Sequence, residues 1–165
     1  MFVYYFVPLA RAPFEVARRA LLATVEDLPE AAAVAYRQGE EIRARLSGGG
    51  LAKTVRLELG TPLDSGGQVT IPLLWEATGT PSLFPRMEAD LTLAAMGPDR
   101  CHLAFRGSYH PPLGQLGQAL DRALLHRIAE SSVKGFVDRL AEAIVEGMPP
   151  PAQVAGPNGG RRRDT

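Results

Sequence analysis

Apolar residues occupy every second position in four successive segments of this chain, and this period of two constrains the fold more than any other feature. In the segment from 87 to 95, the polar residues Glu88, Asp90 and Thr92 lie between apolar odd-numbered positions. Side chains of a β-strand alternate between two faces, so the pattern predicts strands with one buried and one solvated face. The apolar positions are Leu51, Val55, Leu57 and Leu59; Val69, Ile71, Leu73, Trp75 and Ala77; Met87, Ala89, Leu91, Leu93 and Ala95; and Cys101, Leu103, Phe105, Gly107 and Tyr109.

Turn residues separate these segments at 60–67, 78–85 and 97–99, which predicts an antiparallel meander. Pro72 falls inside the second segment, and proline cannot donate a hydrogen bond to a neighbouring strand. It predicts an edge position, a bulge, or an amide that faces away from a partner. Charged residues alternate on the solvated face, where cross-strand pairing explains them without catalysis: Glu58, Glu76, Glu88 and Asp90 with Arg56, Arg86 and Arg106.

Helical patterns flank the meander on both sides. An aromatic-rich buried strand is predicted at 2–9, a first helix follows Pro13, and a second helix spans about 31–46. A long helical region runs from about 114 to 146 and carries two apolar stripes. Its second stripe, Val133, Phe136, Val137, Leu140 and Ile144, is the better candidate for crossing the sheet.

Composition limits the classes of protein that fit. The 165 residues predict one domain, at 1–147, followed by a disordered tail rich in Pro, Gly and Arg at 148–165. Eighteen basic residues balance eighteen acidic ones, which argues against a duplex nucleic-acid binder. No stretch approaches the 18 or so apolar residues of a membrane span, so we expect no membrane insertion and a cytoplasmic location. The single cysteine, Cys101, is expected to be a small buried hydrophobe.

One face of the sheet is apolar throughout, and the C-terminal helix is the long amphipathic element that can cover it. A curved sheet that grips such a helix commonly leaves a cleft. In element order, in Val7–Pro13, in Gly107–Gly114, and in Asp121-Arg122 with Ser132–Phe136, the chain resembles bacterial members of the START/Bet v 1-like (SRPBCC, helix-grip) superfamily. The predicted fold is therefore α+β: an antiparallel sheet of about five strands wrapped around a long C-terminal helix, with two short helices after the first strand. Many members have six strands after the helix pair, where four are predicted here.

The resemblance implies a pocket for a hydrophobic small molecule such as a lipid, sterol or polyketide. The first hypothesis is a binding protein without catalysis, and the second is a polyketide cyclase-like or hydrolase-like enzyme of the same fold. The third is a dimeric interaction module with a filled core, so the protein is either a monomer or a homodimer. Its dimer contact would use Leu113, Leu116, Leu120 and Leu124.

The candidate pocket lining combines large residues of the apolar strand face with the second stripe of the long helix. These residues are Trp75, Met87, Leu91, Phe105, Tyr109, Phe136 and Leu140, with Leu83 and Phe84 as a possible gate. Lys53 and His126 are candidate polar contacts, and together with Tyr109 they are the groups that an enzyme would use. The three histidines lack metal-ligand spacing and no glycine run has phosphate-loop spacing, so no metal, cofactor or assigned catalytic residue is predicted.

Overall fold

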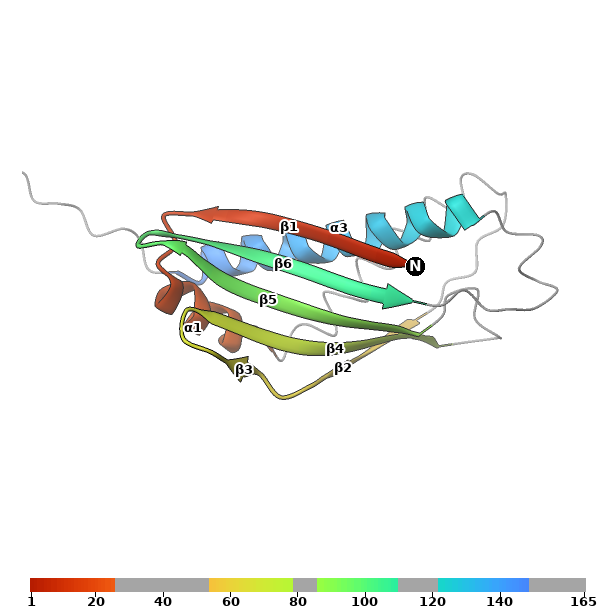
Figure 1. The fold of residues 1–165 in the computed structure, drawn as a ribbon, viewed down its shortest axis with the longest axis horizontal. Coiled ribbons are helices and arrows are strands. Elements are labelled where there is room, and N and C mark those ends of the chain that lie inside the picture. The colour runs from red at the N-terminus through yellow and green to blue at the C-terminus, as the bar shows by residue number, and fades with distance from the viewer. Residues whose placement is uncertain (26–53, 79–85, 110–121, 149–165) are drawn as a thin grey trace, which may run out of the picture.

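Six antiparallel strands form one sheet, and α3 (Arg122–Glu146) lies along one of its faces (Figure 1). The computed structural model describes residues 1–25, 54–78, 86–109 and 122–148. The strands are β1 (Phe2–Ala10), β2 (Thr54–Leu59), β3 (Leu63–Asp64), β4 (Gln68–Thr78), β5 (Met87–Gly97) and β6 (Arg100–Tyr109). Their order is β1-β6-β5-β4-β2, with β3 paired to β4 beyond the end of β2. The predicted α+β helix-grip architecture is confirmed.

The predicted alternation sets the two faces of the sheet. In β1, β2, β4, β5 and β6, odd-numbered residues form the inner face, which α3 covers, and even-numbered residues form the outer face; in β3 the parity is reversed. In β5, for example, Met87, Ala89 and Leu91 are buried while Glu88 and Asp90 are exposed. Neighbouring strands are antiparallel, and β5 and β6 keep one register from Met87 to Ala95, with a shift only between Ala95 and Gly97. The buried residues of the strands therefore line up in rows across the sheet.

Aromatic packing fixes α3 against the inner face. Trp75, Phe105 and Phe136 meet edge to face, with ring centroids 5.6 to 6.4 Å apart. The second stripe of the helix, Val133, Phe136, Val137, Leu140 and Ile144, is buried, as predicted for the half that crosses the sheet. α1 (Phe14–Ala23) follows β1 and packs against α3, and Arg18 in α1 forms an ion pair with Asp64 in β3.

The structure corrects one part of the sequence interpretation, the turn at 60–67, and decides another, the position of Pro72. Residues 60–67 were expected to be a turn, but Leu63 and Asp64 form β3; two residues are too short to give an alternation that a sequence pattern can reveal. Among the described residues the sheet therefore has six strands, where about five were predicted. Pro72 lies in the interior of β4, where its carbonyl accepts a hydrogen bond from Gly60 N–H at 2.8 Å. Its nitrogen faces the same side, in the gap between the end of β2 at Leu59 and the start of β3 at Leu63, where β4 is locally an edge. Of the three readings, the pairing supports this local edge position.

Several predictions lie outside the described residues. These are the helix at 31–46, the start of the long helix at 114–121 and the tail beyond Met148, which all remain predictions. Within the described part, no helix is both long enough and apolar enough to span a bilayer.

Candidate functional site

The last row of the inner face combines large side chains from four strands. The register places Leu57, Trp75, Met87 and Tyr109 side by side, at the end of the sheet where β4 and β6 end and β5 begins. All four residues are buried. This row forms a largely apolar wall that ends in the hydroxyl of Tyr109; the indole N–H of Trp75 is its other polar group.

Tyr109 meets His126 from the first turns of α3. The Tyr109 hydroxyl lies 3.3 Å from His126 Nδ1, and His126 Nε2 lies 3.2 Å from Glu130 Oε1. His126 and Glu130 are one helical turn apart, so both side chains project from the same side of α3. The result is a polar chain that runs from a buried phenol, through a partly exposed imidazole, to an exposed carboxylate.

The surroundings keep the phenol protonated. Burial raises the pKa of Tyr109, and the negative charge of Glu130 raises this pKa further, because both disfavour a phenolate. If His126 Nε2–H donates to Glu130, then Nδ1 is the acceptor and receives the Tyr109 proton. If His126 is charged, Nδ1–H donates to the phenol oxygen and the phenol O–H is released toward another acceptor. Whether the Tyr109 hydroxyl donates or accepts in this contact therefore depends on the charge of His126.

The residues predicted to line a pocket all lie on the inner face. Trp75, Met87 and Tyr109 share the last row, whereas Leu91 and Phe105 lie opposite each other two rows further along the sheet. Phe136 and Leu140 project from α3, and all seven residues belong to one buried apolar cluster. The proposed gate, Leu83 and Phe84, and the proposed polar contact Lys53 lie outside the described residues.

Of the polar candidates, Tyr109 and His126 are brought together and Glu130 was missed. The spacing of four residues between His126 and Glu130 was a usable signal, because such pairs meet on a helix surface. Ser132, also on α3, is buried, and its Oγ has no hydrogen-bond partner in the described part of the chain.

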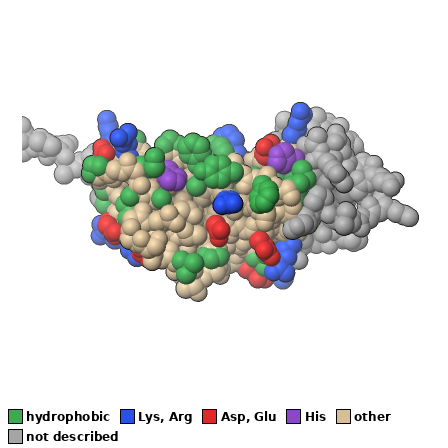
Figure 2. Space-filling view, viewed as in Figure 1, with side chains coloured by type: hydrophobic (Ala, Val, Ile, Leu, Met, Phe, Trp, Pro, Cys, Tyr) green, Lys and Arg blue, Asp and Glu red, His purple; other side chains and the backbone are tan. Residues whose placement is uncertain are grey.

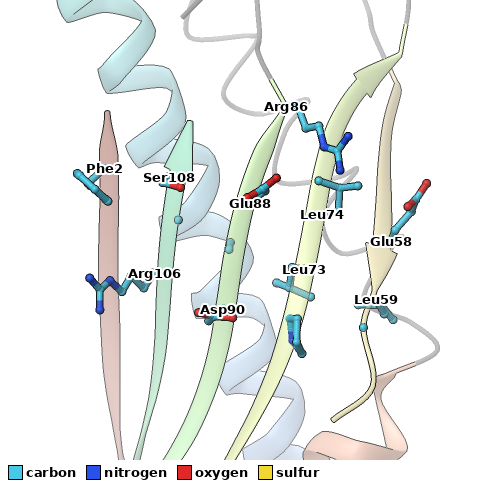
Figure 3. A pocket seen from close by; sticks show the side chains of 14 residues that line it. Phe2, Glu58, Leu59, Leu73, Leu74, Arg86, Glu88, Asp90, Arg106 and Ser108 are labelled. Carbon is cyan, nitrogen blue, oxygen red and sulfur yellow. The ribbon is translucent and has the colours of Figure 1, made fainter. Parts of the chain in front are cut away.

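A hollow lies on the outer face of the sheet. It is an open groove of about 670 Å³ whose residues form two adjacent cross-strand rows (Figure 3). One row is Phe2, Ser108, Glu88, Leu74 and Glu58; the other includes Arg106, Asp90, Pro72 and Gly60. Asp90 and Arg106 are register partners, as expected for cross-strand charges, yet these two side chains do not approach within 4 Å. The groove carries both charges, whereas the Tyr109 end joins a phenol, an imidazole and a carboxylate in one chain of contacts.

The described ranges also hold side chains of the metal-ligating types and the single cysteine. Among those residues, no three His, Cys, Asp or Glu side chains are placed to hold a metal ion. Cys101 is buried, and this burial raises the pKa of its thiol to about 11, so it is a protonated apolar residue at neutral pH.

Among the comparisons with known proteins, the one with a Geobacillus kaustophilus protein supports the fold. No protein-family model matches the chain, and neither does any curated protein. A conserved protein from Geobacillus kaustophilus has a similar structure, with 11% identity and a TM-score of 0.56 over 90% of this chain and 98% of that one. The Zhui aromatase/cyclase from Streptomyces sp. R1128 gives 9% identity and a TM-score of 0.48 over 88% and 94% of the two chains. Ara h 8.0201 gives 14% identity and a TM-score of 0.45 over 88% and 99%.

Proposed function

We propose that this chain, which has the helix-grip fold of the START/Bet v 1-like superfamily, binds a hydrophobic small molecule between the last inner row and the first turns of α3. The observation that carries the proposal is the buried Tyr109 hydroxyl, which stands at the end of an apolar wall and meets the partly exposed His126. A largely apolar wall that ends in a hydroxyl suits an amphipathic ligand, such as a lipid, sterol or polyketide-like molecule. The apolar body would lie against Trp75 and Met87, and its polar group would bond to Tyr109 or His126.

Native mass spectrometry of freshly purified protein, compared with its denatured mass, tests this function first. A co-purified adduct would support the proposal and give the ligand class. If the native mass is bare, a fatty acid, a sterol and a fused-ring polyketide should be added in turn while thermal unfolding is followed. A ligand that binds only the folded state raises the melting temperature. No adduct and no stabilisation by any of the three would contradict the proposal.

Two single-atom variants locate the site. Trp75 is the only tryptophan and lies in the last inner row, so ligand binding there should change its fluorescence. Tyr109→Phe removes the hydroxyl and keeps the ring, and should weaken binding of an amphipathic ligand by about 10-fold, the value of roughly one hydrogen bond. Tyr4→Phe removes an exposed hydroxyl from the outer face and serves as the matched control. Equal affinities of both variants and wild type would place the ligand elsewhere.

The same polar chain favours acid–base catalysis as a second candidate. A protonated phenol backed by an imidazole and a carboxylate can donate a proton to a developing oxyanion and recover it through His126. This role requires that a bound ligand changes chemically. Incubation of protein with the identified ligand, followed by mass analysis of the ligand, distinguishes the two candidates: an unchanged ligand supports binding alone, and a product that disappears in Tyr109→Phe supports catalysis.

A further inference from the structure

The outer face of β1 is unusually apolar for an exposed edge strand. Phe2, Tyr4 and Phe6 are 72%, 62% and 53% exposed, and the rings of Tyr4 and Phe6 lie 6.1 Å apart. Figure 2 looks onto this face and shows a band of hydrophobic side chains along the edge at which β1 lies. The opposite edge differs, because β2 presents the charged residues Arg56 and Glu58 on the same face. Charges of this kind protect an edge from pairing, and β1 carries none of them.

The backbone N–H and C=O groups of these same aromatic residues point outward from the edge of the sheet. Met1 and Tyr109 exchange two backbone hydrogen bonds, at 2.6 and 2.9 Å, so odd-numbered residues of β1 face β6. The amide and carbonyl groups of Phe2, Tyr4 and Phe6 therefore point away from the sheet. Among the described strands, none pairs with that side of β1. Pro8 also faces outward, and its missing N–H marks the end of the row of donors.

We propose that β1 pairs antiparallel with β1 of a second copy of this chain, which joins two sheets into one. Placing Tyr4 opposite the partner's Tyr4 sets Phe2 opposite the partner's Phe6. This is the longest pairing that keeps Pro8 outside, and all three residue pairs exchange both hydrogen bonds. The six aromatic side chains then form one continuous stripe on the outer face. This surface is independent of the Tyr109 end of the inner face.

Charges near the proposed axis are also self-complementary. On the inner side of β1, the Tyr5 hydroxyl donates to Asp138 at 2.9 Å, and Lys134 lies 3.1 Å from the same hydroxyl. Lys134 and Asp138 form an ion pair one helical turn apart. A two-fold axis beside Tyr4 brings the Lys134–Asp138 pair of one copy near the same pair of the other copy. Each pair contains one basic and one acidic group, so the two copies do not repel each other there.

Sedimentation velocity across a concentration series tests the dimer. Wild type is expected to dimerise, and Tyr4→Lys should raise the dissociation constant by about 100-fold or more, because it sets two like charges opposite each other in the new ladder. Leu63→Lys is the matched control, since Leu63 is 61% exposed on β3 and lies away from β1. Circular dichroism and thermal unfolding should confirm that both variants fold. A wild type that stays monomeric, or a dimer that Tyr4→Lys leaves equally tight, would overturn the proposal.

Disulfide trapping tests the register on folded protein. Tyr4→Cys should form a covalent dimer on mild oxidation, whereas Phe6→Cys alone should not. The double variant Phe2→Cys/Phe6→Cys should cross-link again, because each new cysteine then faces the other kind in the partner. The native Cys101 is buried and does not compete. Efficient cross-linking of Phe6→Cys alone would overturn the proposed pairing.

Discussion

The hydroxyl of Tyr109 lies 3.3 Å from Nδ1 of His126, and this contact joins the last residue of β6 to the first turns of α3. A second polar contact, between Tyr5 and Asp138, joins β1 to the middle of the same helix. Between them the buried residues of α3 are apolar except for Ser132. The helix is thus oriented by two tyrosine hydroxyls, and the one at Tyr109 is also the proposed ligand contact.

Tyr109→Phe should cost about 1 kcal/mol of unfolding free energy, because it removes one partly buried hydrogen bond and leaves the ring packed. Urea unfolding measures this cost. In a double-mutant cycle with His126→Leu, the two changes should be non-additive by about 0.5 to 1.5 kcal/mol. Additive effects would show that the two side chains contribute separately.

Gly107→Ala should destabilise the protein by roughly 1 to 3 kcal/mol. A Cβ atom at this position would lie 2.9 Å from Met87 Sδ and 2.9 Å from a ring carbon of the fully buried Phe105. Thermal unfolding is the measurement. Met87→Ala removes one of the two obstacles, so the cost of Gly107→Ala should be smaller in that background. An unchanged cost would assign the strain to Phe105 alone.

The sequence predicted the sheet and the gripping helix because burial has a simple period in each. The alternation of Met87 to Leu93 and the stripe from Val133 to Ile144 are both recovered as buried faces. The two-residue strand Leu63–Asp64 was missed because its existence depends on pairing with Val69 and Thr70, not on local pattern.

The candidate site was predicted only in part, because it also depends on contacts between elements that are distant in the sequence. Tyr109 and His126 were each identifiable as polar groups on apolar elements, but their contact depends on where α3 crosses the sheet. The exposure of the aromatic side chains of β1 was missed for another reason. The run from Phe2 to Val7 is apolar on both faces, so hydropathy predicted a buried strand, whereas the sheet order leaves its even-numbered side uncovered in the described structure.

Ser132→Ala should leave stability unchanged or raise it by up to about 1 kcal/mol. The Ser132 hydroxyl is buried without a hydrogen-bond partner among the described residues, so its removal relieves a desolvation cost and creates little space. Ser131→Ala, at the half-buried neighbouring position, is the control and should have no such gain. A loss of more than about 1 kcal/mol in Ser132→Ala, measured by urea unfolding, would show that the hydroxyl is bonded in solution.

Stability should fall with rising pH above about 9, and Cys101 should account for part of this fall. Burial raises the pKa of its thiol from 9.0 to about 11, so the folded state holds this proton more tightly than the unfolded state does. The associated stabilisation is complete below pH 9 and is lost as the pH rises to about 11, which amounts to roughly 2 to 3 kcal/mol. The raised pKa of Tyr109 acts in the same direction at higher pH.

Urea unfolding of wild type and Cys101→Ala across this pH range should give a shallower decline of stability in the variant. A thiol reagent should modify the native protein far more slowly than the unfolded chain. Parallel declines in both proteins, together with rapid modification of the native thiol, would contradict a buried and protonated Cys101.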